Sequence, residues 1–248
     1  MSLFRKLFGP KPAPEAPPPL PEAPFYAIGD IHGRADLLQA LVAQIEGEDP
    51  AARLVFVGDY IDRGEQTRAV LDWLQAYQAR ASARHPVFLM GNHERMCLDF
   101  IDNPEAAGAR WLRNGGLQAL ASYGVGMGAQ QADLAEMHRD LVAAMGEATL
   151  AWLRGLALSW RSGNVAVVHA ALDPVMSFTM QPESVLLWGH PAFLRRPRGD
   201  GLWVVHGHTI VDAPYAAQGR IAVDTGAYGT GRLSAARIGD GQVRFLST

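Results

Sequence analysis

Short apolar runs alternate with amphipathic segments along the first hundred residues of the chain. Three runs are short enough to be buried strands: residues 25–28, 54–57 and 87–90. Two segments between them repeat apolar side chains at helical spacing, and a third helix is expected farther on: residues 34–45, residues 66–77, and a stretch from about residue 94. This alternation predicts strand–helix–strand units with parallel strands.

The pattern changes in the second half of the chain. Residues 106–156 are expected to be mostly helical, and we interpret them as a helical insertion or cap. Short strands are expected after it: residues 156–160, 165–168, 202–205, 221–223, 232–238 and 243–246. Parallel strands with helices, followed by mostly antiparallel strands, predict an α/β fold in which two sheets pack face to face with helices outside.

The first 24 residues differ from the rest in composition. Residues 9–24 contain eight prolines, which lack an amide donor and fix φ, so this stretch is expected to be an extended linker. Residues 1–8 mix apolar and basic side chains but are too short for a signal peptide. We therefore expect a disordered tail and proline-rich linker over 1–24 and one domain over 25–248. A docking role for the proline-rich tail is a weaker alternative.

Composition excludes several classes of protein. The net charge of the 248 residues is −3 without a long basic block, so no nucleic-acid partner is expected. No apolar run approaches the roughly 18 to 20 residues of a transmembrane segment. The single cysteine, Cys97, excludes an intramolecular disulfide, is expected in the core, and fits the reducing cytoplasm.

Polar motifs follow five of the expected strands and supply the ligands of a metal centre. They contain Asp30, His32, Asp59, Asn92, His169 and His208. The carboxyl ends of parallel strands share one edge of a sheet, where ligands bind in α/β folds. Asp59 can bridge two ions, and mixed oxygen and nitrogen donors suit Mn²⁺, Fe or Zn²⁺ better than Ca²⁺ or Mg²⁺. Two such ions would activate a bridging water as a hydroxide for in-line attack on a phosphate.

The remaining polar residues of these motifs have separate expected roles. His93 is placed to give a proton to the leaving-group oxygen, and Asp62 to orient that imidazole. Arg63 can donate two parallel hydrogen bonds to a phosphate group. Glu94 is expected to start the following helix rather than take part in the chemistry.

These motifs, quoted as they stand, carry a specific resemblance. Gly29-Asp30-Ile31-His32-Gly33, Gly58-Asp59-Tyr60-Ile61-Asp62-Arg63-Gly64, Gly91-Asn92-His93-Glu94, the late His169 and Gly207-His208-Thr209 occur in that order, and the segments Trp111–Gly116 and Asp224–Tyr228 also match. Together they resemble calcineurin-like metallophosphoesterases of the phosphoprotein phosphatase type, in the bacterial branch. That branch includes serine/threonine protein phosphatases and symmetrical diadenosine tetraphosphatases.

The resemblance implies a four-layer αββα sandwich with a binuclear, often Mn²⁺-dependent, centre. It assigns Asp30, His32 and Asp59 to one ion, and Asp59, Asn92, His169 and His208 to the other. His93 with Asp62 becomes the acid pair, and Arg63 a phosphate clamp. The chain departs from the family at Trp188-Gly189-His190, where a Trp-x-Arg segment is usual. We expect His190 to take the place of that second clamp. Arg195 and Arg196 are alternatives that fit solvent-facing charges better.

The expected function is hydrolysis of phosphomonoesters, with phosphoserine or phosphothreonine in proteins as the first substrate class. Hydrolysis of symmetrical dinucleoside tetraphosphates and of small phosphate esters are alternatives. A non-catalytic phosphate-binding protein is disfavoured, because every expected ligand and the acid pair are present. Nuclease and cyclic phosphodiesterase activity are disfavoured because Ile210 stands where a second histidine is usual. His206 is expected to pack rather than bind metal, and His85 and His138 to lie on the surface.

Overall fold

The computed structural model describes residues 16–126 and 133–248. Its strands are β1 (Phe25–Ile28), β2 (Arg53–Phe56), β3 (Val87–Phe88), β4 (Ser159–Ser162), β5 (Val165–Val168), β6 (Trp203–His206), β7 (Tyr215–Ala217), β8 (Arg220–Ala222), β9 (Ser234–Gly239) and β10 (Gln242–Ser247). Its helices are α1 (Ala35–Glu48), α2 (Thr67–Arg80), η2 (Ser82–Arg84), α3 (Asn92–Asp102), α4 (Pro104–Trp111), η3 (Leu112–Gly116), α5 (Leu117–Ser122), α6 (Leu134–Arg154), η4 (Phe178–Met180), α7 (Glu183–Trp188) and α8 (Ala227–Thr230). Within these residues, no helix combines the length and apolarity needed to cross a bilayer.

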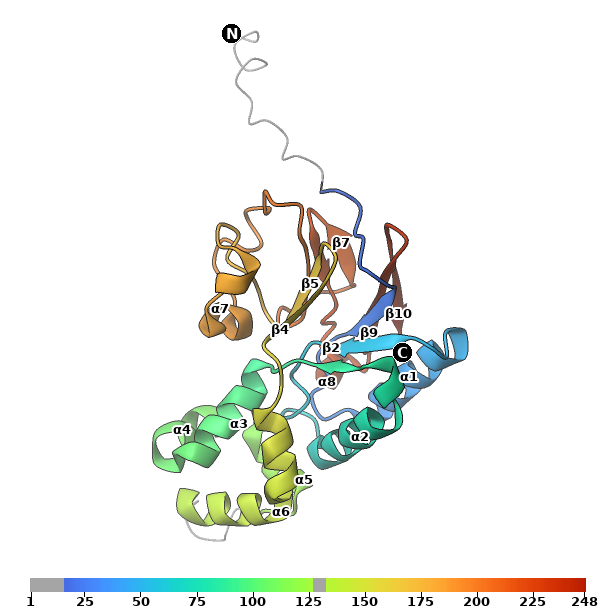
Figure 1. Cartoon of the computed structure of the whole chain (residues 1–248). Coiled ribbons are helices and arrows are strands. Elements are labelled where there is room, and N and C mark those ends of the chain that lie inside the picture. The colour runs from blue at the N-terminus through green and yellow to red at the C-terminus, as the bar shows by residue number, and fades with distance from the viewer. Residues whose placement is uncertain (1–15, 127–132) are drawn as a thin grey trace.

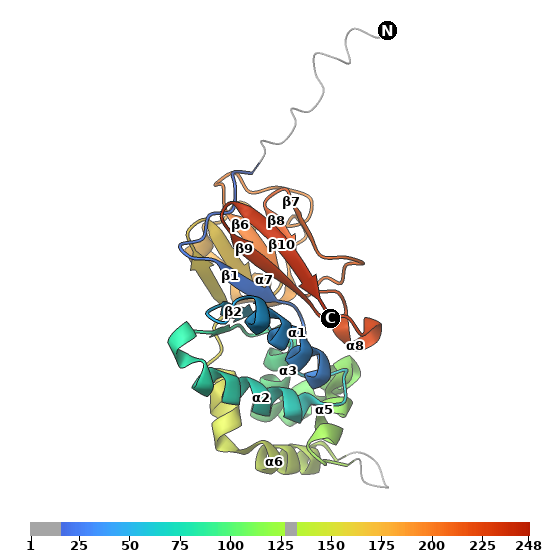
Figure 2. The ribbon, with the colours of Figure 1, turned by 90° about the vertical axis from the view of Figure 1, so that its right-hand side faces the viewer.

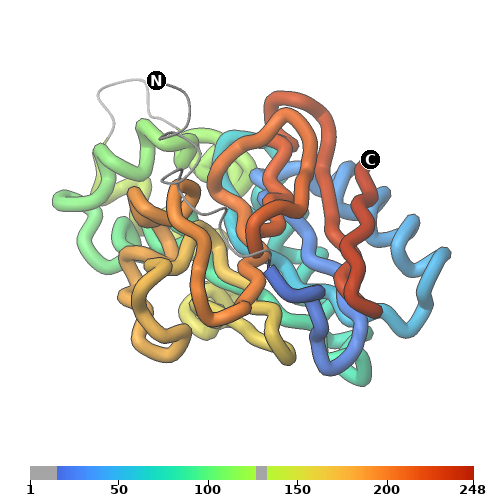
Figure 3. Tube along the Cα trace, turned by 90° about the horizontal axis from the view of Figure 1, so that it is seen from above, coloured from blue at the N-terminus to red at the C-terminus, as the bar shows by residue number. Residues whose placement is uncertain are grey.

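Two five-stranded sheets form the centre of the molecule. The first has the order β10-β9-β1-β2-β3, and the second the order β4-β5-β6-β8-β7. β1 is parallel to β2, and β2 to β3, as the strand–helix–strand pattern predicted. β1 also pairs antiparallel with β9, so early and late segments of the chain lie side by side (Figure 3).

The second sheet is more mixed than the sequence suggested. β4 pairs antiparallel with β5, and β7 with β8, but β5, β6 and β8 run parallel. The connection from β5 to β6 contains α7, a helix that the sequence pattern did not reveal. It is only six residues long, which is too short for a periodic apolar signal. The parallel order brings the carboxyl ends of β5 and β6 to one edge.

Side chains of β1 alternate between two cores. Tyr26 and Ile28 pack with α1 and α2, whereas Phe25 and Ala27 pack between the sheets. Burial of both faces explains why the strand is an uninterrupted apolar run. The outer face of the second sheet is covered by α7 and the following loop, on the side away from α1 and α2 (Figure 1). The layers are therefore helix, sheet, sheet, helix, with a thin fourth layer.

The helical insertion lies against the first helical layer. Helices α4 and α6 pack on α3, and α5 and α6 pack on α2. Helix α6 lies on the side of α2 away from the sheets (Figure 2). Buried side chains such as Leu141 and Leu153 on α6 belong to the same core as α1 and α2. Residues 127–132, which belong to the predicted helical insertion, lie outside the described residues.

The described part of the proline-rich segment is hydrogen-bonded to the second sheet of the sandwich. Asn164, in the turn between β4 and β5, donates to the Pro18 carbonyl at 2.9 Å and accepts from the Leu20 amide at 2.6 Å. The Trp203 indole donates to the Pro17 carbonyl at 2.5 Å. Residues 16–24 thus form a strap across the amino ends of β5 and β6. The rest of the predicted tail, residues 1–15, lies outside the described residues.

Candidate metal centre

The structure brings the six predicted metal ligands to one edge of the sandwich. They follow the carboxyl ends of five strands: Asp30 and His32 after β1, Asp59 after β2, Asn92 after β3, His169 after β5 and His208 after β6. All except the half-buried His208 are buried. Because each strand contributes only one or two ligands, the centre depends on both sheets being packed together.

Asp59 lies between two groups of candidate ligands. Its Oδ2 is 3.4 Å from His32 Nε2, and its Oδ1 is 3.5 Å from His169 Nε2. The ligand atoms of His32, Asp59 and His93 lie within 4.8 Å of one another, as do those of Asp59, His169 and His208. A carboxylate with one oxygen directed toward each group has the geometry of a bridging ligand.

Asn92 joins the second group through its amide oxygen. This Oδ1 is 2.9 Å from His169 Nε2 and 2.8 Å from His208 Nδ1. The other ring nitrogen of His169, Nδ1, is 3.1 Å from the Val57 carbonyl, which can only accept a hydrogen bond. Nδ1 therefore carries the proton, and in a neutral ring the Nε2 lone pair faces the Asn92 oxygen.

The same arrangement occurs at His32. Its Nδ1 donates to the Ile61 carbonyl at 2.8 Å, so the Nε2 lone pair faces the Asp59 carboxylate. Burial lowers the pKa of His32 to about 3 and also lowers that of His169, which keeps both rings neutral. Lone pairs and a carboxylate that face one another without a proton between them repel. A cation removes this repulsion, so the donor set fits bound metal ions.

Asp30 contributes an unpaired oxygen to this edge. Its Oδ2 accepts from the His208 amide at 2.9 Å, while its buried Oδ1 has no hydrogen-bond partner in the described part of the chain. A buried carboxylate oxygen without a donor is costly unless a cation binds it. Asp30 therefore also fits a metal ligand, although it is not one of the residues clustered tightly around Asp59.

The backbone is strained at several residues near the edge of the sandwich where the candidate ligands lie. His32, Asp59, Asp62, Arg63 and His208 all have positive φ, between 45° and 69°. Such conformations are disfavoured for residues with a side chain and cluster at functional sites. These backbone conformations are unfavourable on their own, so the surrounding hydrogen bonds must maintain them.

His93 and Asp62 form a close pair beside the first ligand group. His93 Nδ1 is 2.7 Å from Asp62 Oδ2, and Nε2 is 3.9 Å from Asp59 Oδ2. Burial lowers the pKa of His93, but the charges of Asp59 and Asp62 more than offset this and raise it above the usual value. Burial also raises the pKa of Asp62 to about 6, even with His93 and Trp111 bonded to it. A protonated His93 with Nε2 facing the centre has the arrangement of a proton donor.

Arg63 lies next to this pair at the mouth of the centre. Its Nη2 is 3.3 Å from His93 Nε2, and its Nη1 donates to the Tyr228 hydroxyl at 2.9 Å. The guanidinium carbon is also 4.9 Å from the centre of the Tyr228 ring. Tyr228, in the C-terminal part of the chain, thus restrains the guanidinium. Its segment was singled out in the sequence, but nothing there indicated Arg63 as its partner.

His190 lies apart from the two ligand groups. Its Nε2 is 3.8 Å from Asp173 Oδ2, and its Nδ1 accepts from the Ala192 amide at 3.3 Å. No contact with a predicted metal ligand is found for it among the described residues. The two alternatives, Arg195 and Arg196, are exposed, as their solvent-facing interpretation predicted.

Three other predictions for single residues can be compared with the structure. His206 is fully buried, packs edge-on against Phe193 at 5.0 Å and is not among the clustered ligand residues, as its packing interpretation predicted. Cys97 is buried in the core. His85 is exposed, and His138 is partly exposed, with its Nε2 2.9 Å from the Ile101 carbonyl. Nothing in the sequence near residue 138 indicated that partner.

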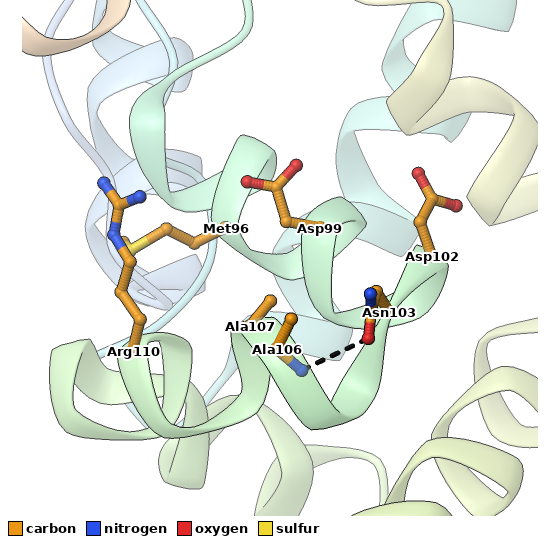
Figure 4. A pocket seen from close by; sticks show the side chains of 7 residues that line it. All are labelled: Met96, Asp99, Asp102, Asn103, Ala106, Ala107 and Arg110. Atoms are coloured by element: carbon orange, nitrogen blue, oxygen red, sulfur yellow. Dashed lines mark hydrogen bonds between the residues drawn. The ribbon is translucent and has the colours of Figure 1, made fainter.

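A separate cavity of about 320 Å³ lies between α3 and α4. It is lined by Met96, Asp99, Asp102, Asn103, Ala106, Ala107 and Arg110 (Figure 4). None of these residues belongs to the ligand groups. Arg154 pairs with Asp102 at 2.5 Å, which neutralises part of the acidic lining.

Comparison with known proteins agrees with this geometry. The family model described as calcineurin-like phosphoesterase matches residues 23–212. A symmetrical bis(5'-nucleosyl)-tetraphosphatase from Janthinobacterium sp. (strain Marseille) is 34% identical over 106 residues. That match spans 36% of this chain and 37% of the relative, so only about a third of the relative's length is aligned.

Solved structures share the fold at low sequence identity. A protein assigned provisionally as a diadenosine tetraphosphatase superposes with a TM-score of 0.64 and 20% identity, covering 94% of this chain and 98% of that one. The cold-active protein-tyrosine phosphatase of a psychrophile Shewanella sp. superposes with a TM-score of 0.59 and 17% identity, covering 94% and 82%. At these identities the likeness shows the fold alone.

Proposed function

This chain belongs to the calcineurin-like phosphoesterase family, and on that basis we propose that it hydrolyses phosphomonoesters with two divalent metal ions. One observation carries the proposal. The Nε2 lone pairs of His32 and His169 face the two carboxylate oxygens of Asp59, with no proton between them. The proposed ligands are Asp30, His32 and Asp59 for one ion, and Asp59, Asn92, His169 and His208 for the other. When bound, the ions would supply an activated water and neutralise charge on the phosphate. We propose manganese, with iron and zinc as alternatives.

The residues beside the ligands would handle the substrate. We assign Arg63 to the phosphate oxygens, since its guanidinium lies next to His93 and offers parallel donors. We assign His93 to the proton that the leaving oxygen needs, and Asp62 to holding the ring so that Nε2 points into the centre. His190 is proposed as a secondary contact at the edge of the site.

The acid pair favours a substrate with a poor leaving group. Phosphoserine and phosphothreonine release an alkoxide, which must be protonated, whereas a dinucleoside tetraphosphate releases a nucleotide that is a stable anion. A buried histidine whose pKa is raised by two carboxylates suits the first reaction better. We therefore propose phosphoprotein as the substrate and the cytoplasm, where a free thiol such as Cys97 stays reduced, as the location.

The match to a symmetrical tetraphosphatase supports a second candidate, the cleavage of dinucleoside tetraphosphates. One assay separates the two. Metal-stripped protein, with Mn²⁺ restored, is given p-nitrophenyl phosphate, a phosphothreonine peptide and diadenosine tetraphosphate, beside the His93→Asn variant. Mn²⁺-dependent turnover of the peptide that the variant loses supports the first candidate. A preference for the dinucleotide supports the second, and no turnover of any substrate would overturn the proposed hydrolase.

A further inference from the structure

The buried Trp111 reaches the acid pair from the helical insertion. Its indole Nε1–H donates to both oxygens of Asp62, at 3.1 and 3.0 Å, although the two residues are 49 positions apart. Both side chains are completely buried. We propose that the segment Trp111–Gly116 positions Asp62 and Arg63, and that Trp111 in particular is a positioning residue for proton donation by His93. This inference rests on the proposed hydrolase function.

The Asp62 carboxylate has few other partners. Among the described residues, His93 and Trp111 are the only hydrogen-bond donors to it, and no lysine or arginine pairs with it. Since a carboxylate can rotate about its χ2 angle, one contact to His93 does not fix its plane. The indole N–H of Trp111 contacts both oxygens and therefore fixes the plane of the carboxylate. The orientation of the His93 ring therefore depends on Trp111 through Asp62.

The other end of the same segment holds the Arg63 backbone. Asp62 and Arg63 have φ values of 69° and 64°, a conformation that residues with side chains avoid. The Arg63 amide donates to the Gly115 carbonyl at 3.2 Å, and the Asp62 amide donates to Thr67 Oγ1 at 3.1 Å. These contacts keep the strained turn in place.

The two glycines of the segment allow it to approach this closely. Gly115 has a φ of 106°, and a Cβ there would lie 2.6 Å from the Arg63 nitrogen. A Cβ on Gly116 would lie 2.7 Å from the Trp111 ring. Both positions are too crowded for a side chain, so the glycines are needed for the segment to contact the turn and the ring at once.

A buried tryptophan also packs, so the test must separate positioning from packing. The Trp111→Phe variant keeps an aromatic ring beside Phe100 but removes the N–H. Proton donation matters for phenyl phosphate, whose leaving group is a poor anion, and hardly for 2,4-dinitrophenyl phosphate, whose leaving group is stable. We expect Trp111→Phe to reduce kcat on phenyl phosphate about 10- to 100-fold. Turnover of the dinitrophenyl ester should stay within about twofold by the same reasoning.

The matched control is Trp152→Phe. Its indole donates to Gln78 at the surface of the same helical layer, at 2.5 Å, and it contacts no residue of the acid pair. This variant should change turnover of neither ester. Equal losses on both esters in Trp111→Phe, or no loss on either, would overturn the inference, whereas a wild-type protein inactive on both would instead overturn the proposed function.

A second measurement does not depend on activity. In ¹⁵N-tryptophan-labelled protein, the indole signal that disappears in Trp111→Phe is that of Trp111 Nε1–H. Because its acceptor is a carboxylate, this signal should shift clearly in Asp62→Asn. It should stay unchanged in Asp99→Asn, which alters a carboxylate that lines the separate cavity between α3 and α4. An indole chemical shift that does not change in Asp62→Asn would contradict the inference. In kinetics, Trp111→Phe should add little to the loss already caused by Asp62→Asn, whereas additive losses would contradict an action through Asp62.

Discussion

The carboxylate of Glu94 holds the backbone of Asp59. Its Oε2 accepts from the Asp59 amide and from the Gly91 amide, both at 2.8 Å, and its Oε1 accepts from the Tyr60 amide at 2.8 Å. Glu94 is completely buried in the first turn of α3. One side chain thus connects the loop after β2 to the loop after β3 and fixes the position of the Asp59 backbone relative to Asn92.

Substitution of Glu94 by glutamine should weaken the metal centre. An amide has one acceptor oxygen, so its NH₂ group would face at least one backbone N–H and leave it unpaired. A buried unpaired donor costs about 1–3 kcal/mol, and we expect a loss of that size in the free energy of unfolding. Displacement of Asp59 should lower Mn²⁺ affinity about 10- to 100-fold, as for other residues that orient ligands.

Urea unfolding and calorimetric Mn²⁺ titration would measure both effects. The control is Glu147→Gln on α6, where the side chain is exposed. Unchanged Mn²⁺ affinity in Glu94→Gln would show that the Asp59 loop holds its position without this clamp.

The position of the candidate metal ligands at one edge was predictable because their signals are local. Each ligand follows a short apolar run, and the end of a strand fixes where its side chain lies. Asp30, Asp59 and Asn92 were therefore placed on one edge from spacing alone. The apolar alternation likewise predicted the parallel strands β1 to β3 and the two packed sheets.

Contacts between distant segments were not predictable in this way. Trp111 bonds to a residue 49 positions away, and Tyr228 to one 165 positions away. Both aromatic residues lie in segments that resemble the family, but nothing in those segments indicates which distant side chain each one contacts. The strap over residues 16–24 shows the same limit, since its proline content indicated an extended chain but not the acceptors that Asn164 and Trp203 would find there.

Replacement of His190 by arginine should improve turnover. A guanidinium extends farther than an imidazole, keeps its charge at every working pH, and donates two parallel hydrogen bonds to phosphate. We expect kcat/KM for p-nitrophenyl phosphate to rise about 3- to 10-fold, which corresponds to the net contribution of about 1 kcal/mol from one ordinary hydrogen bond. Steady-state kinetics beside the exposed Arg195→Lys variant would measure this. An unchanged rate would mean that position 190 does not reach the phosphate.

Substitution of Asn164 by alanine should release the strap. The side chain bonds to the Pro18 carbonyl and to the Leu20 amide, and alanine removes both bonds. We expect the free energy of unfolding to fall by about 1–2 kcal/mol and the strap to become sensitive to proteases, since both hydrogen bonds are partly solvent-exposed. Phosphatase activity should not change, because the strap lies at the opposite ends of β5 and β6 from the metal ligands. Limited proteolysis that spares the strap would argue against this anchoring role.

His206 should make the protein less stable in mild acid. Burial lowers its pKa from 6.5 to about 4, so below pH 6.5 the unfolded chain binds a proton that the folded chain does not. The folded state therefore loses stability as the pH falls from 6.5 to 4, and regains it as the pH rises. At pH 5 the expected loss from this one group is about 2 kcal/mol relative to pH 7.5.

The His206→Gln variant removes this titration while keeping a polar side chain of similar length. Its stability relative to the wild type should therefore improve by about 2 kcal/mol between pH 7.5 and pH 5, as measured by urea unfolding in the presence of Mn²⁺. Because His206 packs on Phe193 and is not among the clustered ligand residues, the Mn²⁺ content of the variant should match that of the wild type. The exposed His85→Gln variant should follow the wild type at both pH values. A loss of bound Mn²⁺ in His206→Gln would contradict the packing role and make His206 a contributor to the metal centre.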